Sequence, residues 1–191
     1  YKGRDAYRFM GRSFTFDQVD DLSRAFAAYL HGLGLARGDR VAVMLPNVPQ
    51  YPVAVAGILR AGMVVVNVNP LYTPRELEHQ LKDSGAKAIL ILENFANTLE
   101  QVADAVPAKH IILAAMGDQM GLLKGTLVNY VVRNVKKMVP AFSLPTAVRF
   151  NDAIAKGRGQ AFIAPKVGLD DIALLQYTGG TTGVSMGTAE C

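Results

Sequence analysis

The sequence predicts an α/β domain with a largely parallel sheet and helices on both faces, preceded by a small hairpin. Short apolar or β-branched runs alternate with longer runs of helical period along most of the chain. Gly and Pro separate most of these runs. This alternation is typical of right-handed β–α–β units, whose crossover helices cover both faces of the sheet.

The hairpin and a helix open the chain. Residues 6–10 and 13–16 have the composition of two short strands around a tight turn. Thr15 and Gln18 have the spacing of a capping box, so we expect a helix to begin directly after the hairpin. Apolar residues then recur at helical spacing until Gly32, where we expect this helix to end.

The following elements are expected in alternation. We expect strands at 40–45, 63–68, 87–92, 110–113 and 172–177, with helices at 50–61, 74–84 and 95–105. Thr73 and Glu76 give a second capping box with Pro74 at the first helical position, and Gly85 is a C-terminal stop for that helix. Residues 157–160 and 165–166 read as a loop or linker before the last strand.

One segment, residues 116–145, interrupts the alternation. Its part Leu122–Val139 is mainly apolar and includes four cations. On a helical wheel one face holds Leu127, Val131, Val135 and Met138, while Asn129, Arg133 and Lys136 lie away from it. Two interpretations stay open: a basic amphipathic helix lying on an anionic membrane surface, or a helix packed on its own domain with a solvated basic face.

Composition excludes several classes of protein. Of 191 residues, 50% are hydrophobic and 19% are charged, which is ample material for a core. A net charge of +4 without a dense basic block gives no support for nucleic-acid binding. Cys191 is the one cysteine, so one chain offers no disulfide and no cysteine metal site, which fits a reducing compartment. No apolar run reaches the eighteen or so residues of a membrane span.

Isolated polar residues give weaker signals. His31, His79 and His110 are scattered without a ligand or orienting partner at a useful spacing, so we interpret them as ordinary histidines. The pair Asp170-Asp171 precedes a strand and is interpreted as a solvated turn. The polar stretch 67–72 follows a Val-rich strand, and either lines a site or forms a turn in which Asn side chains bond to the backbone.

The most distinctive stretch is the phosphate loop, as we name residues 177–187. It reads Tyr177, Thr178, Gly179, Gly180, Thr181, Thr182, Gly183, Val184, Ser185, Met186 and Gly187. Glycines allow a close backbone approach, and consecutive N–H groups with hydroxyl donors can surround an anion. The loop has neither the Lys of a Walker motif nor the spacing of a dinucleotide fingerprint. By itself it fits either an anion-binding loop or a Gly/Thr turn after a buried strand.

Several stretches together carry a resemblance to a known family. They are 38–43, 45–47, 50–52, 57–62, 65–77, 135–140 and 175–185. In this order they resemble the adenylate-forming (AMP-binding) enzymes, and specifically the bacterial long-chain fatty acyl-CoA synthetases. The resemblance covers essentially the whole chain up to Ser185. It implies that residues 1–191 are a partial N-terminal AMP-binding domain that ends just after the phosphate loop, without the C-terminal domain.

The resemblance implies a two-step ligase. A fatty acid carboxylate attacks the α-phosphate of Mg-ATP to give acyl-AMP and pyrophosphate, and the CoA thiol then displaces AMP. Residues 177–187 would hold the phosphates of ATP, and Thr178 would lie near Mg²⁺. The partners implied are a long-chain fatty acid, ATP and CoA, in a cytoplasmic protein. Peripheral contact with the inner membrane through 122–139 belongs to the membrane interpretation of that segment, one of the two left open above. No catalytic residue is assigned within the chain.

Two departures from the family limit this interpretation. Family members usually carry Lys at the position of Met186, and Met cannot supply a cation to phosphate. Residues 188–191 do not match the family's continuation. We therefore expect a chain cut at both ends and inactive alone, because the adenine site, the acidic Mg²⁺ ligand and the catalytic lysine lie downstream in the family. The alternative is a natural truncated protein that binds a partner or a membrane surface without catalysis; a kinase or hydrolase fails on the missing Walker lysine.

Overall fold

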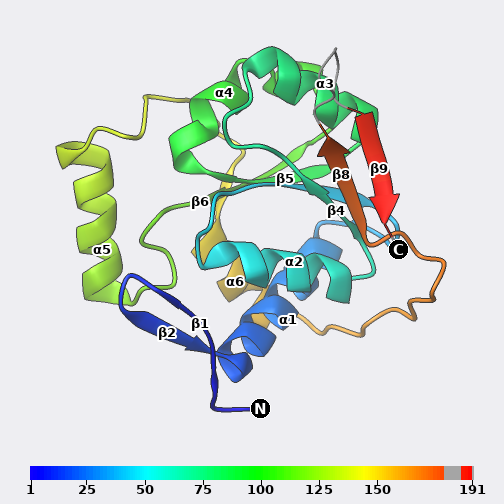
Figure 1. Cartoon of the computed structure of the whole chain (residues 1–191), viewed down its shortest axis with the longest axis horizontal. Helices are drawn as coiled ribbons and strands as arrows, with labels where there is room; N and C mark the ends of the chain where they lie inside the picture. Colours follow the sequence, from blue (N-terminus) through cyan, green and yellow to red (C-terminus); the bar gives the residue numbers. More distant parts are fainter. Residues whose placement is uncertain (179–185, 191) are drawn as a thin grey trace.

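A single sheet forms the centre of the protein. The structure, a computed structural model, describes residues 1–178 and 186–190. Within them, seven strands pair in the order β7-β6-β5-β3-β4-β8-β9, all parallel except β8 with β9 (Figure 1). The strands are β3 (Arg40–Met44), β4 (Val64–Asn67), β5 (Ala88–Leu92), β6 (His110–Ala114), β7 (Val148–Arg149), β8 (Leu174–Thr178) and β9 (Met186–Glu190). The predicted fold class is confirmed.

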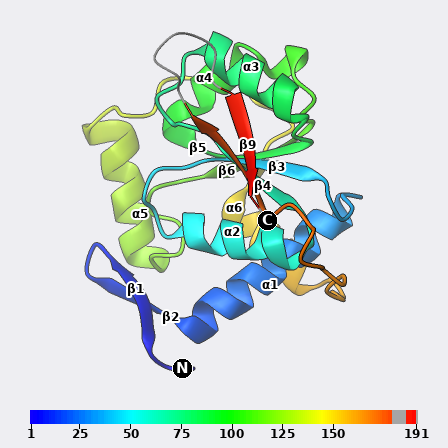
Figure 2. The same cartoon turned by 45° about the vertical axis from the view of Figure 1, so that its right-hand side comes forward.

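Helices cover both faces of this sheet. One layer contains α1 (Phe16–Gly32), α2 (Gln50–Arg60) and α6 (Phe150–Arg158), and the other contains α3 (Pro74–Ser84) and α4 (Ala96–Glu100) (Figure 2). Neighbouring strand residues point to opposite faces. In β3, Val41 and Val43 join the core beneath α1, α2 and α6, while Ala42 and Met44 join the core beneath α3 and α4. The strands are therefore apolar on both sides, as expected of a buried parallel sheet.

The hairpin and the two capping boxes form where the sequence predicts them. Strands β1 (Asp5–Phe9) and β2 (Arg12–Thr15) pair antiparallel around Met10 and Gly11, which both have positive φ, as a tight two-residue turn requires. Thr15 caps α1 through a complete capping box, and Thr73 does the same for α3. Gly85 ends α3 in the left-handed conformation, at φ 64°.

The helix expected at 95–105 is wrong in extent. The segment forms a 3₁₀ turn, η1 (Glu93–Phe95), then α4, and a second 3₁₀ turn, η2 (Ala103–Ala105). Val102 leaves helical geometry at φ −128°, and Val106 is extended at φ −107°, ψ 155°. Pro107 favours an extended residue before it, so a helix cannot continue through Val106.

The loop expected at 157–160 and 165–166 is wrong at its start, because Gly157 and Arg158 form the last turn of α6, whereas 159–160 and 165–166 lie outside helices and strands as expected. This helix and the short strand β7 were not predicted. Gly157 lies against α1: a Cβ atom there would stand 1.9 Å from the carbonyl oxygen of Ala25. The glycine therefore permits a close approach of two helices, whereas the sequence alone suggested a loop residue.

We expect Gly157→Ala to destabilise the chain by about 2–4 kcal/mol, because the new methyl group must push α6 away from the backbone of α1. Gly159→Ala is the matched control, since its Cβ would stand 3.5 Å from its nearest neighbour, and we expect a change within about 0.5 kcal/mol. Urea unfolding followed by circular dichroism measures both. Equal stability of the two variants would contradict the close helix contact.

The segment after β6 contains α5 (Leu122–Tyr130) and a π-helical turn, η3 (Val131–Val135). The segment turns apolar side chains to solvent and polar side chains to the domain, which is the reverse of a helix that packs its apolar face. Leu127 and Val135, expected on that face, are 63% and 60% exposed. Arg133, expected to point away from the domain, instead contacts a buried carboxylate. The interpretation as a helix that packs its apolar face on the domain is therefore wrong.

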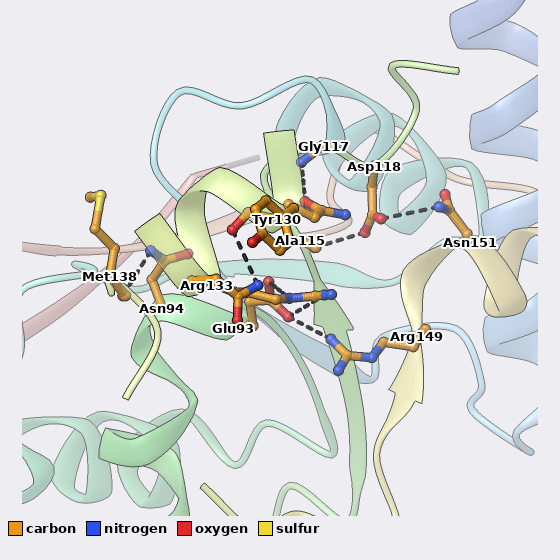
Figure 3. Close-up of polar contacts among 12 residues, drawn as sticks. Glu93, Asn94, Ala115, Gly117, Asp118, Tyr130, Arg133, Met138, Arg149 and Asn151 are labelled. Carbon is orange, nitrogen blue, oxygen red and sulfur yellow. Dashed lines mark hydrogen bonds and ion pairs between the residues drawn. The ribbon is translucent and has the colours of Figure 1, made fainter. Parts of the chain in front are cut away.

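A buried glutamate fastens this segment to the sheet (Figure 3). Glu93 follows β5 directly and its side chain is 1% exposed. Arg133 donates to both of its carboxylate oxygens at 2.8 Å, and Arg149 donates to one of them at 2.7 Å. Asn94 donates to the carbonyl of Met138 at 3.0 Å. Such charge-assisted, bidentate bonds hold the helix in one orientation on the domain.

Asp118 lies close to this cluster and is 8% exposed. It accepts hydrogen bonds from the amide of Ala115 at 2.7 Å and from the side chain of Asn151 at 3.0 Å (Figure 3). Burial raises the pKa of the Asp118 carboxyl to about 6, a direction that the nearby Glu93 charge reinforces. Because the pKa is above its unfolded value, the folded state binds the proton more tightly than the unfolded state.

The pH dependence of stability should reveal this proton. The contribution of Asp118 is fully present below about pH 4 and is lost as the pH rises through about 6. Against an Asp118→Asn variant, the free energy of unfolding of the parent chain should therefore fall by on the order of 2–3 kcal/mol between pH 4 and 7. Urea unfolding at several pH values gives the difference. A difference that stays constant over this range would contradict the raised pKa.

Candidate functional site

The predicted phosphate loop lies at the carboxyl end of β8. Strand β8 pairs with β4, with Asn67 opposite Gln176, and the backbones of Thr178 and Met186 pair where β8 ends and β9 begins. The two ends of the loop are therefore side by side at the edge where the parallel strands finish (Figure 1). Ligands of open α/β sheets bind at this edge. Residues 179–185 of the prediction lie outside the described part of the chain.

A hydrogen-bond network joins the strand ends to the helices on both faces of the sheet. The amide of Asn67 accepts from the hydroxyl of Tyr51 at 3.0 Å and donates to Gln176 at 3.0 Å. Its backbone carbonyl accepts from the side chain of Gln80 at 2.7 Å, and Gln80 is 1% exposed. Helices α2 and α3 are thereby both bonded to the end of β4, and β4 is bonded to β8.

Tyr177 anchors the other face of the same strand end. Successive residues of a strand point to opposite faces, so Tyr177 packs in the core beneath α3 while Gln176 points to the side of α2. The Tyr177 hydroxyl donates to the carboxylate of Asp83 on α3 at 2.5 Å. Burial and this hydrogen bond raise the pKa of the hydroxyl, which therefore stays protonated as a donor.

This arrangement can set the direction in which the chain leaves β8. Both residues before Thr178 are held by hydrogen bonds, one from each face of the sheet. The amide side chain of Asn67 and the buried position of Tyr177 restrict the rotation of the strand end. A loop that must present backbone N–H groups to an anion benefits from such a fixed origin, because the ordering is complete before the ligand arrives.

Three contributors to this network were missed from the sequence: Tyr51, Gln80 and Asp83. Gln80 offered a signal, because it lies at an inward position of α3 between Leu77 and Leu81, where a polar side chain needs a partner. Of the two open interpretations of 67–72, the turn is confirmed at Asn69, and a role in lining a site stays a prediction. Asn67 takes part in the network, while Asn69 accepts from the amide of Leu71 at 3.0 Å in an exposed turn.

The weaker sequence signals are placed away from this network. His31 contacts the carbonyl of Ala61 at 3.1 Å and the ring of Phe162, as an ordinary structural histidine does. Asp171 accepts a bidentate ion pair from Arg37 at 2.6 and 2.7 Å, which lowers the pKa of its carboxyl, and the turn interpretation is confirmed. In the part of the chain that the structure describes, no three His, Cys, Asp or Glu residues gather to hold a metal ion.

We expect Asn67→Ala to destabilise the chain by about 1–3 kcal/mol, because it leaves the Tyr51 hydroxyl and Gln176 each without this hydrogen-bond partner. Asn69→Ala, in the exposed turn nearby, is the matched control and should cost about 0.5 kcal/mol. Urea unfolding of the three proteins decides the matter. The network would lose its proposed importance if the two variants proved equally stable.

Comparison with known proteins assigns the fold. Over 98% of its length, the chain aligns with the solved structure of the anthranilate CoA ligase AuaEII in complex with anthranoyl-AMP, with a TM-score of 0.77 and 24% identity, covering 31% of that chain. A long-chain-fatty-acid-CoA ligase from Archaeoglobus fulgidus aligns over 99% of this chain and 32% of its own, with a TM-score of 0.70 and 22% identity. These similarities establish the fold.

Similarity in sequence is closer. The chain is 57% identical over 188 residues to the long-chain-fatty-acid–CoA ligase of Escherichia coli O157:H7, which is 98% of this chain and 34% of that protein. It is 34% identical to the ligase of the same name from Bacillus subtilis, over 98% of this chain and 33% of the relative. The chain thus spans about a third of the length of the curated relatives it matches. Residues 1–187 match the family described as AMP-binding enzyme, and the chain belongs to that family.

Proposed function

We propose that this chain is the N-terminal part of the AMP-binding domain of an ATP-dependent long-chain fatty acid–CoA ligase. One observation carries the proposal: 57% identity over 98% of the chain to ligases of that name, across the strands that lead to the phosphate loop. The geometry supports it, since the loop begins at the carboxyl edge of the sheet on a strand held from both faces. Catalysis belongs to the longer protein.

The reaction has two transfers. A fatty acid carboxylate oxygen bonds to the α-phosphorus of ATP, the bond from that phosphorus to the bridging oxygen breaks, and pyrophosphate leaves. The sulfur of CoA then bonds to the acyl carbon, its proton is released, and AMP leaves. Residues 177–187 are proposed to hold the β- and γ-phosphates through backbone N–H groups and threonine hydroxyls, which stabilises charge on the departing pyrophosphate.

A magnesium ion would accompany the nucleotide. Thr178, at the end of β8, is the residue that we propose to lie near it, because a hydroxyl is a hard oxygen donor. Mg²⁺ bound to a nucleotide keeps most of its ligands on phosphate and water, so a single hydroxyl at a strand end fits this role without an acidic cluster.

The longer reading frame that contains this chain tests the ligase proposal. The protein should release AMP and pyrophosphate from ATP only when a long-chain fatty acid is supplied, and should form acyl-CoA with CoA. Thr181→Ala with Thr182→Ala should lower the rate by about 10²-fold, as loss of donors to a transferring phosphoryl group does. Thr126→Ala, an exposed threonine on α5, is the control and should leave the rate unchanged.

Met186→Lys adds a separate readout. Because a cation near the phosphates should strengthen ATP binding, this variant should lower the KM for ATP with a smaller effect on kcat. ATP turnover without a fatty acid, or no turnover with any acid tested, would count against the ligase proposal.

A second proposal concerns location: a cytoplasmic protein in peripheral contact with the inner membrane through residues 122–139. The observation that favours it is the exposure of the apolar side chains there, with Leu122 and Leu123 89% and 88% exposed. Among the residues that the structure describes, none of the helices has the length and apolar character needed to cross a membrane. Contact through a surface helix needs neither.

A further inference from the structure

Helix α5 presents its apolar side chains to solvent. Leu123, Leu127 and Tyr130 are 88%, 63% and 59% exposed. Their spacing of four and three residues places them in one line along the helix. We name these three residues the outer stripe. Surface helices ordinarily turn such a line toward their own core, so its exposure on a structured helix is a feature to explain.

The opposite side of the same helix is polar and fixed to the domain. Asn129 accepts from the backbone amide of Gly117 at 2.7 Å, and Arg133 pairs with the buried Glu93 (Figure 3). Gly125 is buried against Gly117, where a Cβ atom would stand 2.5 Å from the carbonyl oxygen. Rotating the helix to bury the outer stripe would break these contacts and expose the Glu93 carboxylate. The stripe is therefore held outward by the fold itself.

The segment that carries the stripe has charges of one sign. Residues 119–151 contain three lysines and two arginines and no aspartate or glutamate. Both arginines are paired with Glu93, which leaves the three lysines to set the charge of the surface. Lys124 lies within α5, where its ammonium group donates to the carbonyl of Met10, and Lys136 and Lys137 follow the π-helical turn. Exposed lysines at both ends of an apolar line are typical of helices that lie in the interface of an anionic bilayer.

We propose that the outer stripe inserts into the headgroup region of an anionic lipid bilayer, with Lys136 and Lys137 contacting lipid phosphates. This inference rests on the peripheral contact proposed above and names the face and the lipid class. A bilayer fits better than a protein because lysine is depleted at protein interfaces, and α5 lies at the edge of the molecule (Figure 1). The face differs from the one that the helical wheel suggested, which included Val135 and Met138.

The proposed membrane face and the β8–β9 hairpin are well separated. In Figure 1, α5 lies at the left edge of the molecule and the β8–β9 hairpin at the right. A protein lying on a bilayer through the outer stripe would therefore keep the carboxyl edge of β8 open to solutes. The two proposals place no conflicting demands on one surface.

A single tryptophan can report the insertion directly, because the chain contains none. In Leu127→Trp, the indole fluorescence should shift to the blue when vesicles of phosphatidylglycerol and phosphatidylethanolamine are added, and should stay unchanged with phosphatidylcholine alone. Leu169→Trp is the matched control, since Leu169 is 96% exposed in a distant loop, and should show no shift. Circular dichroism confirms that both variants keep the parent fold.

Co-sedimentation with the same vesicles separates the apolar and the charged contributions. Leu123→Ser with Tyr130→Ser should weaken binding by about tenfold or more, because buried apolar area drives interfacial insertion. Lys136→Glu with Lys137→Glu should weaken it by about tenfold. The controls Leu71→Ser with Leu169→Ser, both highly exposed residues, and Lys2→Glu with Lys166→Glu should bind as the parent does.

The outcomes distinguish this inference from the proposals on which it rests. If the parent chain binds anionic vesicles but the indole of Leu127→Trp shows no shift, the contact lies elsewhere and the outer stripe is the wrong face. If the parent does not bind, both the stripe and the peripheral contact are wrong, while the ligase assay is untouched because vesicle binding needs no ATP. Blue-shifted emission of Leu127→Trp without vesicles, in this chain or in the longer protein, would show that protein covers the stripe and would also overturn the inference.

Discussion

The burial of both faces of the parallel sheet is the constraint on which the rest of the structure depends. Strands β3, β4 and β5 are apolar on both sides, so two helical layers must cover them. Right-handed crossovers then bring the carboxyl ends of neighbouring strands to one edge. Strand β8 joins the sheet beside β4, although more than a hundred residues separate them in the chain, and its carboxyl end lies at that same edge. The position of the phosphate loop follows from this pairing.

Polar side chains are concentrated where the apolar sheet ends. Asn67 stands one residue beyond the valines of β4 and is bonded to Tyr51 and Gln176, while Tyr177 reaches Asp83 from the other face. Polar groups removed from water need hydrogen-bond partners, and each of these hydrogen bonds also restricts the positions of the two side chains that it joins. The same residues that satisfy one another thereby fix the strand end. For the phosphate binding that we propose, a fixed origin of the loop would reduce the ordering that must accompany binding.

The segment between β6 and β7 follows a different principle. It is attached to the sheet by charge, through Glu93 and its two arginines, rather than by an apolar face. Breaking such a pair by removing one partner is costly, because it leaves a buried charge without compensation. The consequence is a helix whose apolar residues are free for another environment. The apolar stripe is thus exposed because the polar contacts attach the opposite side of the helix to the domain.

The sequence by itself determined the local structure. The capping boxes at Thr15 and Thr73, the hairpin and five of the strands could be located because their signals are short-range: a hydroxyl three residues before an amide, or a run of β-branched residues. It also located the phosphate loop after a late strand and supported the family by its motifs. The residues inside that loop stay a prediction.

The tertiary structure alone decided how faces meet. Helical periodicity showed that 122–139 has two faces. It did not show that the polar face would bind Glu93, because that carboxylate lies forty residues away from Arg133 in the chain. Gly157 was interpreted as a loop residue because the contact that requires a glycine there, with the carbonyl of Ala25, is also remote in the chain. The partners of Asn67 and Tyr177 come from α2, α3 and β8 for the same reason. Propensity and period act over a few residues, whereas burial and charge pairing act between segments that only the fold brings together.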